Sequence, residues 1–272
     1  KYALQHKLVN PTGLAVTDLL AASGQALGLW GLEPGLYLGN PAQAMAAIGA
    51  SDFVVASSAF RSVSLESVAD LLLPIGAFAE TSGTFVNGAG DWQSFQGAVA
   101  PPGEARPGWK VLRVLANLLD LKGFDYRDTT QIRAELAALC EGVQPDNAPV
   151  GDLAAALAAA PSGTWEGLTR IGPVPIYSLD PLVRRSAPLQ HSPSGAAFGV
   201  NLHPEQARAL GLVAKDLVEI RQNGTAVQGR VAIDDRVPPG CARIPAAVPG
   251  SEALGPQIGP VTLSKASGAL DA

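Results

Sequence analysis

Cysteine and histidine are scarce in this sequence, with two and three residues among 272. Cys140 and Cys241 lie far apart, and neither belongs to a C-x-x-C pair. Iron–sulfur clusters and structural zinc sites need closely grouped cysteines or histidines, so no such site is expected from this chain alone. The spacing also disfavours a disulfide framework. We interpret both cysteines as small buried apolar residues.

Long apolar runs are missing too, although 47% of the residues are hydrophobic. A membrane-spanning helix needs about 18 or more consecutive apolar residues. Residues 14–31 come nearest, but they are interrupted by the polar residues Thr17, Asp18, Ser23 and Gln25. The sequence therefore predicts no direct membrane span.

Basic charge is in short supply, with a formal net charge of -5 and a pI of about 5.2. An acidic chain is not attracted nonspecifically to nucleic acid, so no nucleic-acid partner is expected. The charge is unevenly distributed, because residues 191–272 carry seven basic and seven acidic residues and the whole excess lies in residues 1–190. This uneven charge distribution, in a chain long enough for two domains, favours two structurally different domains.

The first fifty residues contain two helix-start signals. Asn10-Pro11 predicts a helix that ends near Gly24, and Asn40-Pro41 predicts another that ends near Gly49. In both, Asn supplies the cap and Pro occupies the first helical position, where its missing N–H costs nothing.

Short apolar runs at residues 35–39, 51–57 and 70–75 predict strands between these helical segments. Strands that are uniformly apolar are typical of a parallel sheet covered on both faces. With right-handed crossovers, this pattern predicts an α/β fold with a doubly wound parallel sheet.

Residues 76–106 are rich in glycine and proline and contain only short extended pieces, which is typical of a functional loop or a packing arm. Helix resumes at Pro107, and Asp128 with Gln131 forms a capping-box pattern for a further helix. One face of the first helix is apolar and is expected to pack in the core; it comprises Val111, Leu112, Leu115, Leu118 and Leu119.

The second half of the chain has a different pattern. Residues 149–195, rich in alanine and then in proline, are interpreted as a connector that follows an α/β core at residues 1–148. Residues 196–272 predict a small closed β-barrel of five to seven strands. Asn223-Gly224 is its strongest hairpin signal, because both turn positions need a positive φ.

Two segments resemble the molybdopterin oxidoreductase superfamily. In residues 69–119 the spaced patterns A-D-x-x-L-P, E-x-x-G-T-x-x-N, Q-x-x-x-x-A and G-E-A-R-x-x-W-x-x-L-x-x-L-A are all present. Residues 197–245 resemble the dinucleotide-binding barrel of that superfamily, of the double-psi type. The matching residues of the first segment are Ala69, Asp70, Leu73, Pro74, Glu80, Gly83, Thr84, Asn87, Gln93, Ala98, Gly103, Glu104, Ala105, Arg106, Trp109, Leu112, Leu115 and Ala116.

Within the superfamily, ETSGTFVN and PGWKVLRVLANLL resemble the large iron–sulfur subunits of bacterial NADH:quinone oxidoreductase, respiratory complex I. This resemblance implies a C-terminal scaffold and interaction region with no catalytic residue, metal or cofactor of its own. It implies iron–sulfur clusters in an N-terminal part of the subunit. It also implies other peripheral-arm subunits as partners, on the cytoplasmic side of the bacterial inner membrane in a membrane-associated complex. Lys1 follows no initiator Met or signal pattern, so we expect a longer polypeptide.

Two alternatives remain open. The chain can be a fragment of an active molybdopterin enzyme, similar to formate dehydrogenase or nitrate reductase. A relic nucleotide pocket in residues 191–272 can also still bind a regulatory ligand. Metal content and nucleotide binding distinguish these alternatives from the scaffold hypothesis.

The candidate vestigial cofactor loop contains Glu80, Gly83, Thr84 and Asn87. Many members of the superfamily continue Asn-x-Glu-Gly-Arg, whereas residues 87–91 here read Asn-Gly-Ala-Gly-Asp and lack both charges. The glycines either cradle a phosphate through free backbone N–H groups or simply permit a turn. Glu80 is either catalytic or fixes the loop by accepting from backbone N–H groups, and we favour the second interpretation of each.

The remaining chemical candidates have simpler interpretations. His6, His191 and His203 share no ligand motif, and His203 before Pro204 fits a helix cap. A Ser–His–Asp triad lacks the G-x-S-x-G elbow. Arg106 and Trp109 are interpreted as a cation–π or helix-entry packing pair.

Overall fold

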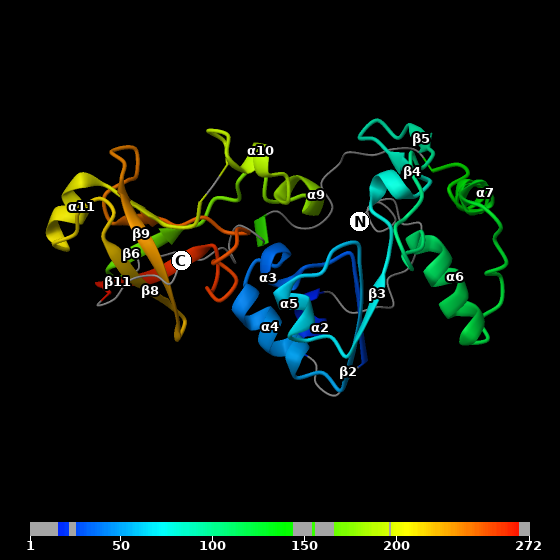
Figure 1. Cartoon of the computed structure of the whole chain (residues 1–272), viewed down its shortest axis with the longest axis horizontal. Helices are drawn as coiled ribbons and strands as arrows, with labels where there is room; N and C mark the ends of the chain where they lie inside the picture. Colours follow the sequence, from blue (N-terminus) through cyan, green and yellow to red (C-terminus); the bar gives the residue numbers. More distant parts are fainter. Residues whose placement is uncertain (1–15, 22–25, 144–153, 156–165, 196, 267–272) are drawn as a thin grey trace.

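The protein is described from a computed structural model that defines residues 16–21, 26–143, 154–155, 166–195 and 197–266. Along the chain, the described part forms a parallel sheet with its helices, an arm of one hairpin and two helices, and a closed barrel (Figure 1). The predicted α/β class with a C-terminal barrel is confirmed.

The sheet contains β1 (Ala26–Trp30), β2 (Phe53–Ser58) and β3 (Leu71–Pro74). Their order in the sheet is β1-β2-β3, and both pairs are parallel, as the apolar runs at residues 51–57 and 70–75 predict. The strand order follows the chain, so both crossovers advance the sheet in one direction.

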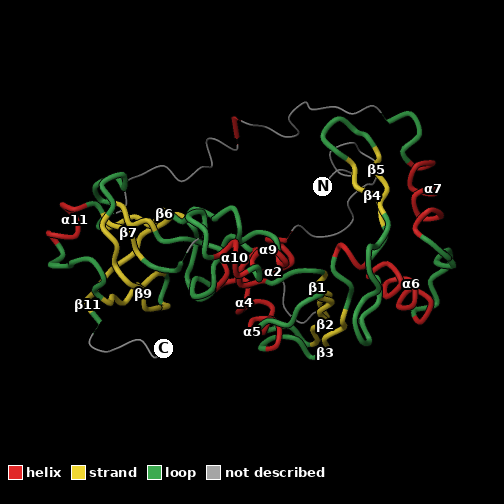
Figure 2. Tube along the Cα trace, turned by 45° about the horizontal axis from the view of Figure 1, so that its top comes forward, coloured by secondary structure: helices red, strands yellow, loops and turns green. Residues whose placement is uncertain are grey.

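Four helices accompany this sheet: α2 (Val16–Ala21), α3 (Pro34–Tyr37), α4 (Pro41–Gly49) and α5 (Val63–Glu66). Side chains from α2, α4 and α5 pack over one face of the sheet, where the buried residues are Leu27, Leu29, Ile48, Val54, Ala56 and Leu65. Both views show α4 and α5 on the same side of the strands (Figures 1 and 2). This is the core of the first body.

The described residues cover the second face of the sheet only in part. Ser57 on β2 is 5% exposed, and the start of α6 at Gly108 lies against Trp30. Trp30, Phe53 and Leu71 are 44%, 46% and 45% exposed. The prediction that the sheet is covered on both faces is therefore met only in part by the described residues. Right-handed crossovers between strands in chain order place their helices on a single face, which explains the difference.

The predicted strand at residues 35–39 is also wrong. Pro34 stands at the first position of the short helix α3, and its ring fixes a helical φ. The strand of this unit is β1, which lies earlier than expected. The Asn40 cap is confirmed, since its Oδ1 accepts from the Gln43 amide at 3.4 Å.

The arm begins with a 3₁₀ turn η1 (Phe78–Glu80) and an antiparallel hairpin of β4 (Gly83–Val86) and β5 (Trp92–Phe95). Two helices follow, α6 (Gly108–Leu118) and α7 (Thr129–Leu139).

The two helices of the arm begin close to the positions that the sequence signals predict. Asp128 caps α7, and its Oδ1 accepts from the amides of Thr130 and Gln131 at 2.9 and 3.0 Å. The side chain of Gln131 accepts from the amide of Arg127 rather than from the amide of Asp128, so the reciprocal bond of the capping box is displaced by one residue. Pro107 is the residue before α6 rather than its first residue.

The apolar face of α6 does not pack in a core, contrary to expectation. Leu118 is 76% exposed and Leu119 is 62% exposed, whereas only Ala116 is buried. Neither of the two described core clusters, which belong to the sheet and to the barrel, includes a residue of α6.

The barrel closes in the order β10-β6-β11-β8-β9-β7. Its six strands confirm the expected size of five to seven. Their bounds are β6 (Leu168–Ile171), β7 (Val200–Leu202), β8 (Leu217–Gln222), β9 (Thr225–Ile233), β10 (Cys241–Arg243) and β11 (Ile258–Lys265). Its core contains fully buried Val200, Leu202, Val218, Ile220 and Ile244.

Two local predictions in the barrel are confirmed. Asn223 and Gly224 adopt φ values of 50° and 82° in the turn between β8 and β9. His203 caps α11 (Pro204–Ala209), and its Nδ1 accepts from the Glu205 amide at 3.2 Å.

The barrel starts before the predicted boundary at residue 196. Strand β6 comes from the Pro-rich segment and pairs with β10 and β11, which lie far along the chain. The same segment forms α9 (Pro181–Arg184) and α10 (Ala187–Gln190). Residues 149–153 and 156–165 of the predicted connector, and residues 11–15 and 22–24 of the first predicted helix, lie outside the described residues.

Candidate functional site

The carboxyl ends of parallel strands are the usual ligand-binding edge of an open α/β sheet. Here the loops that follow β1, β2 and β3 line a pocket of about 180 Å³. Residues from the three loops include Gly31, Ala59 and Ile75. The remaining wall comes from the distant α9 segment, through Asp180 and Leu182. A segment more than a hundred residues away along the chain therefore closes this edge of the sheet.

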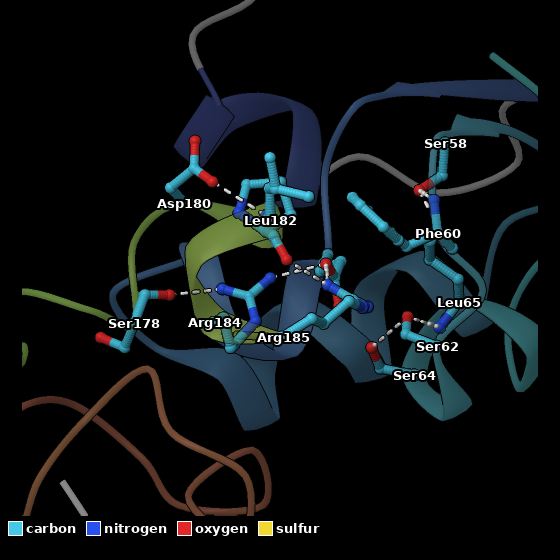
Figure 3. A network of polar contacts seen from close by, with 12 residues as sticks. Ser58, Phe60, Ser62, Ser64, Leu65, Ser178, Asp180, Leu182, Arg184 and Arg185 are labelled. Carbon is cyan, nitrogen blue, oxygen red and sulfur yellow. Dashed lines mark hydrogen bonds and ion pairs between the residues drawn. The ribbon is translucent and has the colours of Figure 1, made fainter. Parts of the chain in front are cut away.

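A buried ion cluster fixes that closure. Glu33, directly before α3, is 3% exposed. Its Oε1 accepts from Arg184 Nη2 at 2.6 Å and from Arg185 Nη1 at 3.0 Å, and its Oε2 accepts from Arg185 Nη2 at 3.2 Å. Two arginines, one at the end of α9 and one just after it, thus converge on one carboxylate from the first body (Figure 3).

Further contacts hold each arginine in place. Arg184 donates to the carbonyl oxygen of Ser178, and its guanidinium lies 5.3 Å from the Tyr37 ring centroid. Arg185 lies 4.4 Å from the Phe60 ring centroid. Guanidinium stacking on aromatic rings adds attraction that a lysine would supply less well.

The start of α9 is positioned by its own cap. Asp180 Oδ1 accepts from the amides of Leu182 and Val183 at 2.8 and 2.9 Å (Figure 3). The cap orients the helix so that Arg184 and Arg185 follow on the side of Glu33. We call Glu33, Arg184 and Arg185 the Glu33 clamp.

The chemistry available to the Glu33 clamp is limited. Both carboxylate oxygens of Glu33 already accept charged hydrogen bonds, so the group is poorly placed to act as a general base. The pocket beside it is smaller than the roughly 300–1,000 Å³ of ordinary ligand sites. The geometry therefore supports joining two parts of the chain more than it supports catalysis.

The four residues of the candidate vestigial loop do not converge on one pocket. Glu80 lies in η1, and its Oε2 accepts from the Ala77 amide at 2.9 Å, as expected for a residue that fixes the loop. Gly83 and Thr84 lie in β4, and Thr84 Oγ1 is 3.0 Å from Ser94 Oγ. Their assignment to a vestigial cofactor loop remains a prediction.

Asn87 organises the turn that follows. Its Oδ1 accepts from the amides of Ala89 and Asp91 at 3.0 and 2.9 Å, and its Nδ2 donates to Asp91 Oδ2 at 2.9 Å. The Gly90 amide donates to the Asn87 carbonyl oxygen at 3.1 Å. A phosphate cradle needs free amides, and these three are already bonded, which favours the simple turn.

The barrel contains a second buried charge that the sequence analysis did not identify. Arg170 on β6 is 1% exposed, and its guanidinium donates to Gln222 Oε1 at 2.9 Å. It also donates to the carbonyl oxygens of Ile244, Pro245, Gly255 and Pro256. Burial lowers the pKa of Arg170 to about 10, so the group stays charged at neutral pH.

The barrel wall also carries a larger hollow of about 750 Å³, beside the Asn223-Gly224 turn. Its polar lining includes Gln206, Arg221 and Gln222. This volume falls within the ordinary range for ligand sites, so the hollow has room for a small molecule.

Other predicted candidates stay apart. The guanidinium of Arg106 donates to the carbonyl oxygens of Gly103 and Ala105, and Lys110, not Arg106, lies over the Trp109 ring at 5.4 Å. The cation–π alternative for Arg106 and Trp109 is therefore not found, and the alternative of helix-entry packing stays a prediction. Spacing in the sequence suggested the pair, whereas the side chain of Arg106 turns back to its own loop.

The described cysteines and histidines, which are Cys140, Cys241, His191 and His203, form no metal-ligand group. Cys140 and Cys241 are unpaired and half-buried rather than fully buried as expected. No group of three or more His, Cys, Asp or Glu residues close enough to hold a metal ion is found among the described residues. His6 lies outside the described residues.

Sequence reasoning missed the Glu33 clamp and Arg170. One signal was available, because Arg184-Arg185 is the only pair of adjacent basic residues in the sequence. It stands in a stretch whose composition indicates an extended connector. Nothing local to residue 33 points to a partner about 150 residues away.

The comparisons with known proteins define the class. Residues 28–118 match the molybdopterin oxidoreductase family and residues 186–268 match the molydopterin dinucleotide binding domain. The chain belongs to the molybdopterin oxidoreductase superfamily, as its sequence resemblance predicts.

Among the relatives, the mitochondrial NADH-ubiquinone oxidoreductase 78 kDa subunit of Candida albicans is 41% identical over 73 residues, which is 27% of this chain and 10% of that protein. A nitrate reductase of Shewanella frigidimarina is 27% identical over 141 residues, 50% of this chain and 15% of that protein. A putative formate dehydrogenase of Staphylococcus aureus is 34% identical over 116 residues, 42% of this chain and 11% of that protein.

A solved structure shares the fold. Acetylene hydratase from Pelobacter acetylenicus matches with a TM-score of 0.65 at 16% identity, covering 92% of this chain and 46% of that one. This chain thus spans less than half of the hydratase, and the segments matched in the three curated relatives amount to 10–15% of their lengths.

The pterin cofactor implied by the family does not fit the carboxyl edge of this sheet. The pocket there is about 180 Å³, and the segment of α9 with the Glu33 clamp fills the approach. In the candidate vestigial loop, two turn amides are bonded to Asn87 Oδ1.

Proposed function

We propose that this chain is the C-terminal scaffold and interaction region of the large iron–sulfur subunit of an NADH:quinone oxidoreductase. Electrons from NADH pass to quinone through iron–sulfur clusters bound outside these residues. The region has no redox centre of its own. It supports the cluster-bearing region of the subunit and contacts neighbouring subunits of the peripheral arm.

The closed carboxyl edge of the parallel sheet is the observation that carries this proposal. In an open α/β sheet this edge is the expected place for a ligand. Here it is filled by the α9 segment, and Glu33 is fully engaged with Arg184 and Arg185. The fold is present while the ligand edge is used for internal support, which fits a scaffold.

The similarity to the 78 kDa subunit supports the assignment to complex I. Among the three relatives compared, this one has the highest identity, at 41%, although the match covers only 27% of this chain. The described residues contain no helix long and apolar enough to cross a membrane. We therefore place the chain in the peripheral arm, on the cytoplasmic side of the bacterial inner membrane, and attribute the membrane association to other subunits.

Purification through a tag on the native-length protein tests this function. The expected result is a multisubunit assembly that oxidises NADH and reduces a quinone analogue. Recovery of the protein alone, or of an assembly that lacks NADH oxidation, contradicts the proposal.

An active molybdopterin enzyme is the second candidate, and two observations favour it. The matches to nitrate reductase and formate dehydrogenase extend over 141 and 116 residues, longer than the 73 residues matched in the 78 kDa subunit. The barrel hollow of about 750 Å³ has room for a nucleotide. Formate- or nitrate-dependent turnover by the purified native protein, without NADH oxidation, would establish this candidate instead.

A further inference from the structure

The dipeptide Asn-Gly occurs at two places in this chain, at residues 87–88 and 223–224. In this dipeptide the side-chain amide of asparagine lies within reach of the next backbone nitrogen, and glycine has no side chain to hinder the approach. Both glycines stand in open surroundings, since a Cβ added to Gly88 or Gly224 would meet nothing within 4 Å. The two places therefore differ mainly in how the structure holds the asparagine.

The side chain of Asn87 is held at both atoms of its amide. Its Oδ1 accepts from the amides of Ala89 and Asp91 at 3.0 and 2.9 Å, and its Nδ2 donates to Asp91 Oδ2 at 2.9 Å. The Asn87 carbonyl oxygen also accepts from the Gly90 amide. Rotation of this side chain towards the nitrogen of Gly88 requires all three side-chain bonds to break.

Asn223 has no such restraint. It is exposed, and within the described part of the chain no hydrogen bond involves its side chain or the amide of Gly224. The turn is closed by the residues on either side, because Gln222 pairs with Thr225 and Thr225 Oγ1 donates to the Gln222 carbonyl oxygen at 2.8 Å. Gly224 can follow a rotation of the Asn223 backbone, since glycine adopts both signs of φ.

We propose that Asn223 is a site of spontaneous deamidation, and that the hydrogen bonds of Asn87 protect the same dipeptide in the arm. The backbone nitrogen of Gly224 attacks Cγ of Asn223, and a new C–N bond closes a five-membered succinimide ring. The bond from Cγ to Nδ2 breaks, and ammonia leaves with the proton that the backbone nitrogen loses. The reaction needs no cofactor and no enzyme.

Water then opens the succinimide ring at one of its two carbonyl carbons. Opening at one carbon gives aspartate at residue 223, and opening at the other gives isoaspartate, in which the main chain runs through the side-chain carbon. The whole change consumes one water and releases one ammonia, and nothing is oxidised or reduced. Each product adds one negative charge to the tip of the β8–β9 hairpin.

The isoaspartate product lengthens the main chain at the turn that sets the register of β8 and β9. A two-residue turn fixes strand pairing through its length, so an added methylene breaks the pair of Gln222 with Thr225. Gln222 is 3% exposed, and its Oε1 accepts from the buried Arg170 at 2.9 Å. Deamidation therefore acts next to the charge that the barrel buries, and we expect it to weaken the barrel as the protein ages.

This inference is independent of the proposed function. It needs only the turn of the barrel and the turn of the arm, and an active molybdopterin enzyme with these two turns would age in the same way. Failure of the ageing experiment below leaves the scaffold proposal untouched.

Peptide mapping of the aged native-length protein tests the proposal. Trypsin releases residues 222–230 and residues 62–110 as separate peptides, each with a single asparagine. Mass spectrometry measures the conversion of amide to acid in each peptide, and enzymatic isoaspartate methylation identifies the isoaspartate product. A sample digested without ageing sets the background. In the folded protein we expect residue 223 to convert at least about tenfold faster than residue 87, which reacts only after its turn opens.

Ageing in urea supplies the matched control, because both dipeptides are then solvated and should convert at similar rates. Equal conversion of the two residues in the folded protein overturns the proposal, and so does faster conversion of residue 87. Conversion of residue 223 in urea but not in the folded protein would show that the hairpin itself blocks ring closure, which also overturns it. Aged protein with residue 223 converted is expected to unfold at a lower urea concentration than fresh protein. An unchanged urea midpoint contradicts the expected weakening of the barrel.

Discussion

Removal of the Glu33 carboxylate is the most informative single change, because it separates the two parts of the chain that the Glu33 clamp joins. The Glu33→Ala variant leaves two guanidinium groups at the sheet edge without an anion. The side chain of Arg184 is only 6% exposed, so water does not readily replace the lost partner. Breaking a buried pair by removing one member costs about 3–5 kcal/mol, most of it from the charge left behind.

The two arginines do not contribute equally to that figure. The side chain of Arg185 is 31% exposed and recovers part of its hydration when the carboxylate is lost. The cost therefore arises mainly at Arg184, and we expect about 3 kcal/mol for Glu33→Ala. A Glu33→Ala, Arg184→Met double variant removes the stranded charge and is expected to recover about half of that loss.

Urea denaturation of the native-length protein measures these free energies, with limited proteolysis of residues 178–185 as a local probe. Arg61→Ala is the matched control, because Arg61 pairs with Glu66 while 84% of its side chain is exposed. Such surface pairs contribute about 0–1 kcal/mol. The reasoning is refuted if Glu33→Ala costs no more than Arg61→Ala, or if the double variant is less stable than Glu33→Ala alone.

Three further predictions concern other parts of the chain. Arg170→Met leaves Gln222 Oε1 and several carbonyl oxygens without a donor, but it also removes the cost of burying the charge. We expect the free energy of unfolding of the barrel, measured with urea, to fall by about 2–5 kcal/mol in balance. An unchanged urea midpoint contradicts this. The Val213 amide and the Lys265 ammonium hold the pKa of Asp216 in the folded protein below its usual range. The ionised carboxylate therefore stabilises the fold at pH values above the pKa of Asp216 in the unfolded chain. This stabilisation is lost as the pH falls through the lowered pKa of the folded protein. Asp216→Asn should therefore flatten an acid unfolding titration on the low-pH side, and an unaltered profile counts against it. Asn87→Ala removes the side-chain acceptor of two turn amides. Hydrogen exchange at these two amides should accelerate, while the metal content of the protein is unchanged. Slow exchange in the variant would show that another group holds the turn.

Local chemistry made a large part of the fold predictable. Caps at Asn40, Asp128 and His203 lie at helix starts because each side chain accepts from amides a few residues ahead. The turn at Asn223-Gly224 follows from the need for positive φ at both positions. These signals depend only on neighbours within the sequence, so they are visible before the chain is folded.

Contacts between distant segments were not predictable in this way. Strand β6 pairs with β10 and β11, and its proline-rich surroundings concealed it. The apolar run GLYLG at residues 35–39 favours a strand. Pro34 instead starts the short helix α3, whose residues are buried by tertiary packing and not by pairing in a sheet. An apolar pattern indicates that a residue is to be covered, not which element covers it.

The same limit explains the candidate site. The pattern at Glu80 and Asn87 identified the family, and the bonds to Ala77, Ala89 and Asp91 follow from short-range geometry. The Glu33 clamp depends on a carboxylate and two guanidinium groups that meet only when the whole chain is folded. Sequence reasoning therefore found the loop and missed the closure of the sheet edge.

The metal content of the native-length protein tests the central claim most directly. The fold is proposed to serve here as a scaffold, with electron transfer through clusters bound elsewhere in the subunit. Elemental analysis of the purified protein should then find iron, with molybdenum and tungsten absent beyond trace amounts. Molybdenum or tungsten in a stoichiometric amount, together with a releasable pterin, would contradict it.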